Sequence, residues 1–126
     1  MDKEIIKEYM RTADEKLDSA RILLEHKKYD DSVSRDYYAV FHCAQALLLS
    51  AGLKAESHSG VRHLFGMHFI KKGKFDKKFA KYLKNLKEDR ENGDYGILTM
   101  IEEDEAKNAL SEAEQFVSET KRFLKV

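Results

Sequence analysis

One stretch of the chain places four side chains with binding chemistry, and one leucine, on a single helical face. If residues 32–51 are helical, that face carries Arg35, Tyr38, His42, Gln45 and Leu49. No Asp, Glu or Lys occurs from residue 37 to residue 53. A solvated helix face normally carries such charges, so we expect another helix or a second subunit to cover this one. The prediction is a homodimer that uses this face; the alternative is a central helix enclosed by its own bundle.

Arg35 and His42 are the strongest candidates for ligand contact on that face. They are seven residues apart, about 10.5 Å along a helix axis, so the arginine side chain can lean toward the imidazole. Arginine, histidine, tyrosine and glutamine together are typical of a phosphate site or of a polar interface. Equally, His42 can be a hydrogen-bonded interior histidine while Arg35 pairs with Asp31. The sequence leaves both interpretations open.

A second candidate surface is basic. Residues 71–87 contain eight lysines and one acid. On a helix, four of them form a stripe opposite the apolar residues: Lys74, Lys77, Lys81 and Lys84. Such a stripe can follow the phosphate backbone of a nucleic acid. Alternatively it is a solvated face, neutralised by the eleven acids of residues 88–119.

Other familiar sites find no support in the sequence. His58, His63 and His68 recur every five residues, which turns each about 140° from the last on a helix, so they cannot share one metal ion. The chain has one cysteine, and motifs such as the phosphate-cradling GxxxxGK or the zinc-binding HExxH do not occur. We therefore expect no metal and no cofactor.

The composition indicates a scaffold of helices. Hydrophobic residues make up 42% of the 126 residues and charged residues 37%, with six glycines and no proline. This predicts an all-α protein, an antiparallel up-and-down bundle of about five helices forming one domain over residues 1–126. The 23 basic and 23 acidic residues cancel, so net charge selects no partner.

Local signals predict where these helices begin and end. The first runs from Glu4 to about residue 27, and the second has a cap at residue 30, 31 or 32 and ends at Gly52. The third begins at Ser57 or at residue 59 and stops at Gly73. The fourth helix begins at residues 75–76, and a turn is expected at residues 93–96. A capping box at residues 99–102 marks the start of the last helix.

The lone cysteine indicates the cellular compartment of the protein. Cys43 lies among apolar residues and cannot form an intramolecular disulfide, which predicts a reduced thiol and a cytoplasmic protein. The first residues carry no apolar signal segment, and the charge-free stretch of residues 37–53 includes His42, Gln45 and Ser50. No membrane association is expected.

Three motifs in order resemble the HEPN family, the higher eukaryotes and prokaryotes nucleotide-binding domain. They are Ser-Arg-Asp-Tyr-Tyr-Ala-Val-Phe-His at residues 34–42, His-Ser-Gly-Val at residues 58–61, and Arg-Glu-Asn-Gly-Asp-Tyr at residues 90–95. The resemblance covers nearly the whole chain. It implies a helical bundle, usually a homodimer, often encoded beside a nucleotidyltransferase in toxin–antitoxin pairs.

The resemblance also implies candidate catalytic residues. Active members are metal-independent ribonucleases with an Arg followed, four to six residues later, by a His. Here Arg90 matches the arginine, whereas Asp94 and Tyr95 stand where the histidine is expected, as in a subgroup with an Arg-x-x-x-Asp-Tyr pattern. Without imidazole, a group that moves a proton near neutral pH is missing from the motif. In some family pairs the partner enzyme transfers AMP to a nearby tyrosine, and Tyr95 is the matching candidate.

Three functions follow as expectations. The first is a dimeric module that binds nucleotide or RNA, and a nucleotidyltransferase partner, through a cleft with Arg35, Tyr38, His42 and His58, joined by Arg90 and Tyr95. The second is a toxin ribonuclease with an altered motif, using Arg90, Asp94 and Tyr95, with His42 as one source of the imidazole. The third is a structural partner subunit.

Overall fold

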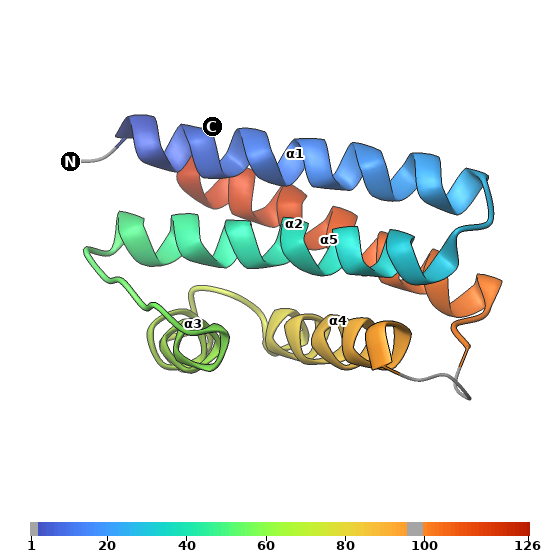
Figure 1. The fold of residues 1–126 in the computed structure, drawn as a ribbon. Coiled ribbons are helices and arrows are strands. Elements are labelled where there is room, and N and C mark those ends of the chain that lie inside the picture. The colour runs from blue at the N-terminus through green and yellow to red at the C-terminus, as the bar shows by residue number, and fades with distance from the viewer. Residues whose placement is uncertain (1–2, 96–99) are drawn as a thin grey trace.

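Helices make up the protein in the computed structural model, which describes residues 3–95 and 100–126, with the backbone alone at residues 92–95 (Figure 1). In chain order the elements are α1 (Lys3–Glu25), α2 (Tyr29–Ser50), α3 (His58–Phe65), the π-helical turn η1 (Gly66–Ile70), α4 (Lys77–Tyr95) and α5 (Glu103–Leu124). The predicted all-α bundle is confirmed.

The four long helices run up and down, and α3 lies across them. In Figure 1, α1 and α2 are antiparallel neighbours, α4 runs below α2, and α5 runs behind α2. α3 is seen end-on, so it crosses the antiparallel bundle that the long helices form. With eight residues it is too short to span the bundle, and it buries Val61 and Phe65 against the end of the core. α2 is the central element, with neighbours on several sides.

Several predicted helix ends are confirmed by local geometry. Ser57 caps α3, its side chain accepting a hydrogen bond from the Gly60 N–H at 2.9 Å. Gly52 and Gly73 follow helical segments with φ of 73° and 74°, a conformation that costs a glycine little.

Two predicted starts are wrong. α2 begins at Tyr29 rather than after a cap at residues 30–32, because the buried Ser32 hydroxyl donates to the Ala20 carbonyl of α1 at 2.8 Å. α5 begins at Glu103, where Glu102 and Glu105 form the capping box and the Glu102 N–H donates to Glu105 Oε1 at 3.1 Å. Thr99, the expected cap, lies outside the described residues.

The core is richest in aromatic rings where α3, η1, α4 and α5 meet. Six phenylalanines pack there with ring centroids 5.4 to 6.2 Å apart: Phe65, Phe69, Phe75, Phe79, Phe116 and Phe123. Cys43 is fully buried on α2, and burial raises the pKa of its thiol to about 12. The thiol is therefore protonated and inert in the folded protein.

The side of α2 that faces α5 carries a buried carboxyl group. Asp36 has no exposed surface, and neither carboxyl oxygen has a hydrogen-bond partner among the described residues. Burial, and then the nearby Glu114, raise the pKa of Asp36 to about 8, while Arg21 acts in the opposite direction. The group is thus mostly protonated at neutral pH.

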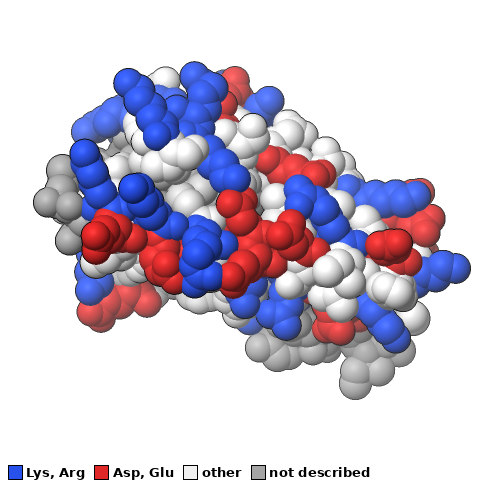
Figure 2. Space-filling view, turned by 90° about the horizontal axis from the view of Figure 1, so that it is seen from above, with Lys and Arg blue, Asp and Glu red and all other residues white. Residues whose placement is uncertain are grey.

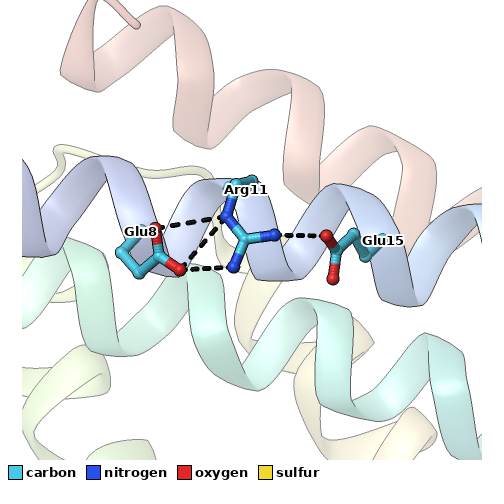
Figure 3. Close-up of polar contacts among 3 residues, drawn as sticks. All are labelled: Glu8, Arg11 and Glu15. Atoms are coloured by element: carbon cyan, nitrogen blue, oxygen red, sulfur yellow. Dashed lines mark hydrogen bonds and ion pairs between the residues drawn. The ribbon is translucent and has the colours of Figure 1, made fainter.

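The outer surface carries charges of both signs. Figure 2 shows acidic and basic side chains interleaved over the face seen from above. On α1, Arg11 lies between Glu8 and Glu15 and pairs with both (Figure 3). Among the described residues, no helix is long and apolar enough to cross a membrane.

Candidate functional site

A tyrosine–histidine pair joins α2 to the start of α3. Tyr37 Oη and His58 Nδ1 are 2.8 Å apart, within hydrogen-bonding distance. The His58 ring also stacks on Phe41, with centroids 4.2 Å apart. Two contacts from one helix therefore fix the imidazole plane, and Nδ1 is the nitrogen engaged with the hydroxyl.

Arg90 reaches this pair from α4. It continues the apolar row of that helix, being seven residues after Leu83 and four after Leu86, so helical periodicity turns it toward α2. Its guanidinium carbon lies 5.4 Å from the Tyr37 ring centroid and 5.2 Å from that of Tyr38. A cation over two tyrosine rings is an attractive arrangement that holds the guanidinium in place.

Arg62 brings a second guanidinium from α3, one helical turn after His58. Its Nε is buried and has no hydrogen-bond partner among the described residues. The two arginines act on the same groups. Burial, then Arg90, then Arg62 lower the pKa of His58. Burial raises the pKa of Tyr37, and Arg90 and Arg62 oppose this rise. The site thus holds two cations beside an imidazole that is neutral at pH 7.

The structure separates the residues that the sequence placed in one cleft. Tyr38, His58 and Arg90 come together. Arg35 is exposed on α2, and His42 is engaged elsewhere. His42 Nδ1 donates to Gln45 Oε1 at 3.0 Å, and its ring stacks on Tyr9 of α1 with centroids 6.1 Å apart. Burial lowers the pKa of His42.

Asp94 and Tyr95 lie at the end of α4, and their side chains are outside the described residues. The turn expected at residues 93–96 is wrong as far as residue 95, because α4 continues through Gly93 to Tyr95. One glycine costs a helix only about 1 kcal/mol, which the packing of α4 on α2 offsets.

Sequence reasoning missed two members of this site, Tyr37 and Arg62. Tyr37 falls on the apolar stripe of α2 and is fully buried, so its position in the sequence indicates a core residue. Its hydroxyl nevertheless reaches His58. A usable signal for Arg62 was its spacing of four residues from His58, which places both on one face of α3.

The face of α2 opposite α5 remains partly open. Tyr38, His42, Gln45 and Leu49 are half-buried, so the helices of one chain do not enclose this strip. At its end lies a cavity of about 530 Å³, whose lining includes Ile5, Tyr9 and Leu53 together with Gln45 and Leu49. The uncharged strip predicted from the sequence is therefore accessible in the single chain.

The described residues contain no cluster of three or more His, Cys, Asp or Glu able to hold a metal ion. The chemistry this site can perform is that of two guanidinium groups, an imidazole and two tyrosine rings. Guanidinium groups donate paired hydrogen bonds to phosphate oxygens, and imidazole can donate or accept a proton near neutral pH. This combination suits phosphate esters.

Comparison with known proteins agrees with the motifs. The HEPN domain family matches residues 6–123. A "UPF0332 protein" of Thermotoga maritima is 38% identical over 121 residues, covering 96% of this chain and 92% of the relative. "Putative toxin MJ0605" of Methanocaldococcus jannaschii is 38% identical over 123 residues, covering 98% of this chain and 91% of the relative. With its helical bundle and its arginine–histidine site, the chain belongs to the HEPN domain family.

Proposed function

We propose that this HEPN domain is a dimeric module that binds the phosphate groups of RNA or nucleotides at the site of Arg62, Arg90 and His58. The observation that carries the proposal is the meeting of two arginines from different helices beside a neutral imidazole. Both guanidinium groups act on the same imidazole and the same tyrosine, so a bound phosphate would be attracted by two positive charges. With the proton on Nε2, His58 adds a further hydrogen-bond donor to the site.

Arginine-to-glutamine substitutions test the binding site. Arg62→Gln and Arg90→Gln are each expected to weaken binding of a fluorescent 2′-O-methyl RNA roughly tenfold or more, since hydrogen bonds to charged groups contribute about 1.5–3 kcal/mol. Fluorescence anisotropy measures the affinity, and circular dichroism checks that the variants fold. Arg11→Gln is the matched control, because Arg11 is an exposed arginine already paired with Glu8 and Glu15 (Figure 3). Unchanged affinity in both site variants would contradict the proposal.

The dimer is proposed to form through the open strip of α2. Its support is the strip's lack of charge and the adjoining cavity with apolar residues in its wall. Such partly exposed, uncharged surfaces are typical of interfaces between subunits.

A single charge at the strip tests the dimer. Leu49→Glu places two like charges near each other across a twofold interface, so the dissociation constant of the dimer is expected to rise more than tenfold. Light scattering across micromolar concentrations measures it. Ile22→Glu is the control, a similar change at an exposed apolar residue of α1. A wild-type protein that is monomeric throughout this range would rule out the dimer.

A nucleotidyltransferase partner belongs to the same proposal. Its support is the family membership and the name of the relative, "Putative toxin MJ0605". Co-purification with a nucleotidyltransferase encoded beside this chain is the expected result.

One observation favours a second candidate function, a metal-independent ribonuclease. The family motif lacks its histidine at residues 94–95, but folding brings His58 to the ring that Arg90 covers. With the proton on Nδ1, His58 donates to the Tyr37 hydroxyl oxygen, and Nε2 carries the lone pair that accepts a proton. The imidazole would then come from α3, and not from His42 on α2.

In this second candidate, Nε2 of His58 takes the proton of an RNA 2′-hydroxyl. The 2′ oxygen forms a bond to phosphorus, and the bond from phosphorus to the 5′ oxygen breaks. The products are a 2′,3′-cyclic phosphate and a 5′-hydroxyl whose proton comes from water. Arg62 and Arg90 stabilise the negative charge that develops on the phosphate, and Tyr37 is a positioning residue.

A further inference from the structure

The cavity at the end of the open strip has walls from three parts of the chain. Its volume is about 530 Å³, within the usual range of small-molecule sites. In Figure 1 the start of α1, the end of α2 and the connection from α2 to α3 lie together on the left, and all three contribute side chains. The apolar part of the wall consists of Ile5, Leu48, Leu49, Leu53 and Val61.

Gln45 brings an unused amide group to this wall. Its Oε1 accepts the hydrogen bond from His42 Nδ1 at 3.0 Å, which orients the side-chain amide. Nε2 of Gln45 has no hydrogen-bond partner among the described residues, and it is not one of the buried polar atoms that lack partners. Its two N–H groups are therefore accessible to a ligand in the cavity, where they require a hydrogen-bond acceptor.

Tyr9 contributes an aromatic ring and a hydroxyl group to the same wall. The ring stacks on His42 with centroids 6.1 Å apart, and this contact holds it in place. The side chain is half-buried, and its hydroxyl bonds to no residue that the structure describes. An aromatic wall favours a planar ligand, because offset and edge-to-face ring pairs are attractive beyond the area they bury.

The charges in the wall cancel. Lys54 and Glu56 are both exposed, and neither forms an ion pair within the described part of the chain. An anionic ligand would meet one cation beside one carboxylate, so the cavity favours an uncharged molecule. Phosphate groups find more positive charge on the lysines of the basic stripe, which are all exposed: Lys74, Lys77, Lys81 and Lys84.

The wall also disfavours a purely apolar ligand. An acyl chain would displace water from the Gln45 amide and the Tyr9 hydroxyl without replacing their hydrogen bonds, which costs free energy. A planar ring that carries carbonyl oxygens accepts from the amide and packs against the aromatic ring. Nucleobases such as uracil combine these two properties.

We propose that the cavity binds one uncharged nucleobase, with a base carbonyl accepting from Gln45 Nε2 and the base stacked on Tyr9. The inference goes beyond the proposed function, because Arg62, Arg90 and His58 are not among the lining residues. The base belongs to a free nucleoside or to an RNA strand, and both present the same ring to the wall.

Titration with uridine, which carries no phosphate, tests the cavity apart from the arginine site. Changes in the NMR chemical shifts of isotope-labelled protein measure the dissociation constant. Gln45→Leu and Tyr9→Leu are each expected to raise it about fivefold or more, the first through lost hydrogen bonds and the second through lost stacking. Gln115→Leu is the matched control, since Gln115 is an exposed amide on α5 outside the cavity. Circular dichroism checks that the variants fold.

Two further measurements separate the two sites and the two sources of the base. Arg62→Gln should leave uridine binding unchanged, so that failure of the arginine site and failure of the cavity are distinguishable. If an RNA strand supplies the base, Gln45→Leu also weakens binding of the 2′-O-methyl RNA. If the ligand is a free nucleoside, the affinity of Gln45→Leu for this RNA equals that of wild type. Both results support a nucleobase in the cavity.

Three results would overturn the inference. The first is the absence of shift changes in wild type at millimolar uridine. The second is equal uridine affinity in wild type, Gln45→Leu and Tyr9→Leu. The third is an apparent uridine affinity that falls as protein concentration rises, because a second subunit then competes for the cavity by mass action.

Discussion

His58→Ala is expected to lower RNA cleavage by purified protein in EDTA at least a hundredfold, the usual contribution of a positioned general base. We expect this loss because His58 Nδ1 lies 2.8 Å from the hydroxyl of Tyr37, and Arg90 lies over the ring of that tyrosine. The cleavage of a ribonucleotide-containing oligomer measures the rate. Binding of the uncleavable 2′-O-methyl strand should fall much less, which separates loss of chemistry from loss of binding.

The pH profile gives a second readout for His58. A general base works when deprotonated, and burial and the two arginines lower the pKa of His58 below its ordinary value. The rate should therefore rise with pH only in the acidic range and be level from about pH 7 upward. His42→Ala is the control, since its ring is held by Gln45 and Tyr9 instead. Equal loss in the two variants, or cleavage that survives His58→Ala, excludes His58 as the base. If the wild-type protein binds RNA without cleaving it, the ribonuclease candidate is excluded and only the binding module remains.

Asp36→Asn is expected to change the pH dependence of stability by the largest amount of any single substitution on α2. The pKa of Asp36 is about 8 in the folded protein and about 4 in an unfolded chain. Between these values the folded state binds one more proton, so the free energy of unfolding falls as pH rises. For wild type the free energy of unfolding is expected to fall by roughly 4 kcal/mol between pH 4 and pH 7.

Asparagine cannot ionise, so this decline should vanish in the variant. Urea unfolding followed by circular dichroism at pH 4, 6 and 8 measures the free energy of unfolding. The variant should become more stable relative to wild type as pH increases. Asp18→Asn is the control, the same change at an exposed position of α1. Parallel pH curves for Asp36→Asn and wild type would show that the carboxyl group is not buried in its neutral form.

The fold was predictable where local chemistry decides it. The cap at Ser57 and the stops at Gly52 and Gly73 depend on a few adjacent residues, and the structure has them as expected. The start of α2 was not predictable in this way, because the Ser32 hydroxyl bonds to a carbonyl twelve residues earlier, on another helix. A contact between helices took precedence over a local preference for capping.

The candidate site, likewise, was predictable only where local sequence patterns determine it. The direction of Arg90 follows from its spacing after Leu86, which sequence alone provides. That Arg90 and Arg62 both act on His58 depends on α3 crossing the bundle, and no local pattern specifies this crossing. His42, one turn after Tyr38 on α2, instead contacts Gln45 and Tyr9.

The position of Arg90 at the end of an apolar row couples recognition to folding. Where Leu83 and Leu86 hold α4 on α2 by burial, Arg90 holds it through the rings of Tyr37 and Tyr38. A ligand that binds this guanidinium only in its seated position favours the seated helix by mass action. Ligand binding at the site therefore increases the local stability of the second half of α4. Saturation with RNA should slow hydrogen exchange of the backbone amides in that half.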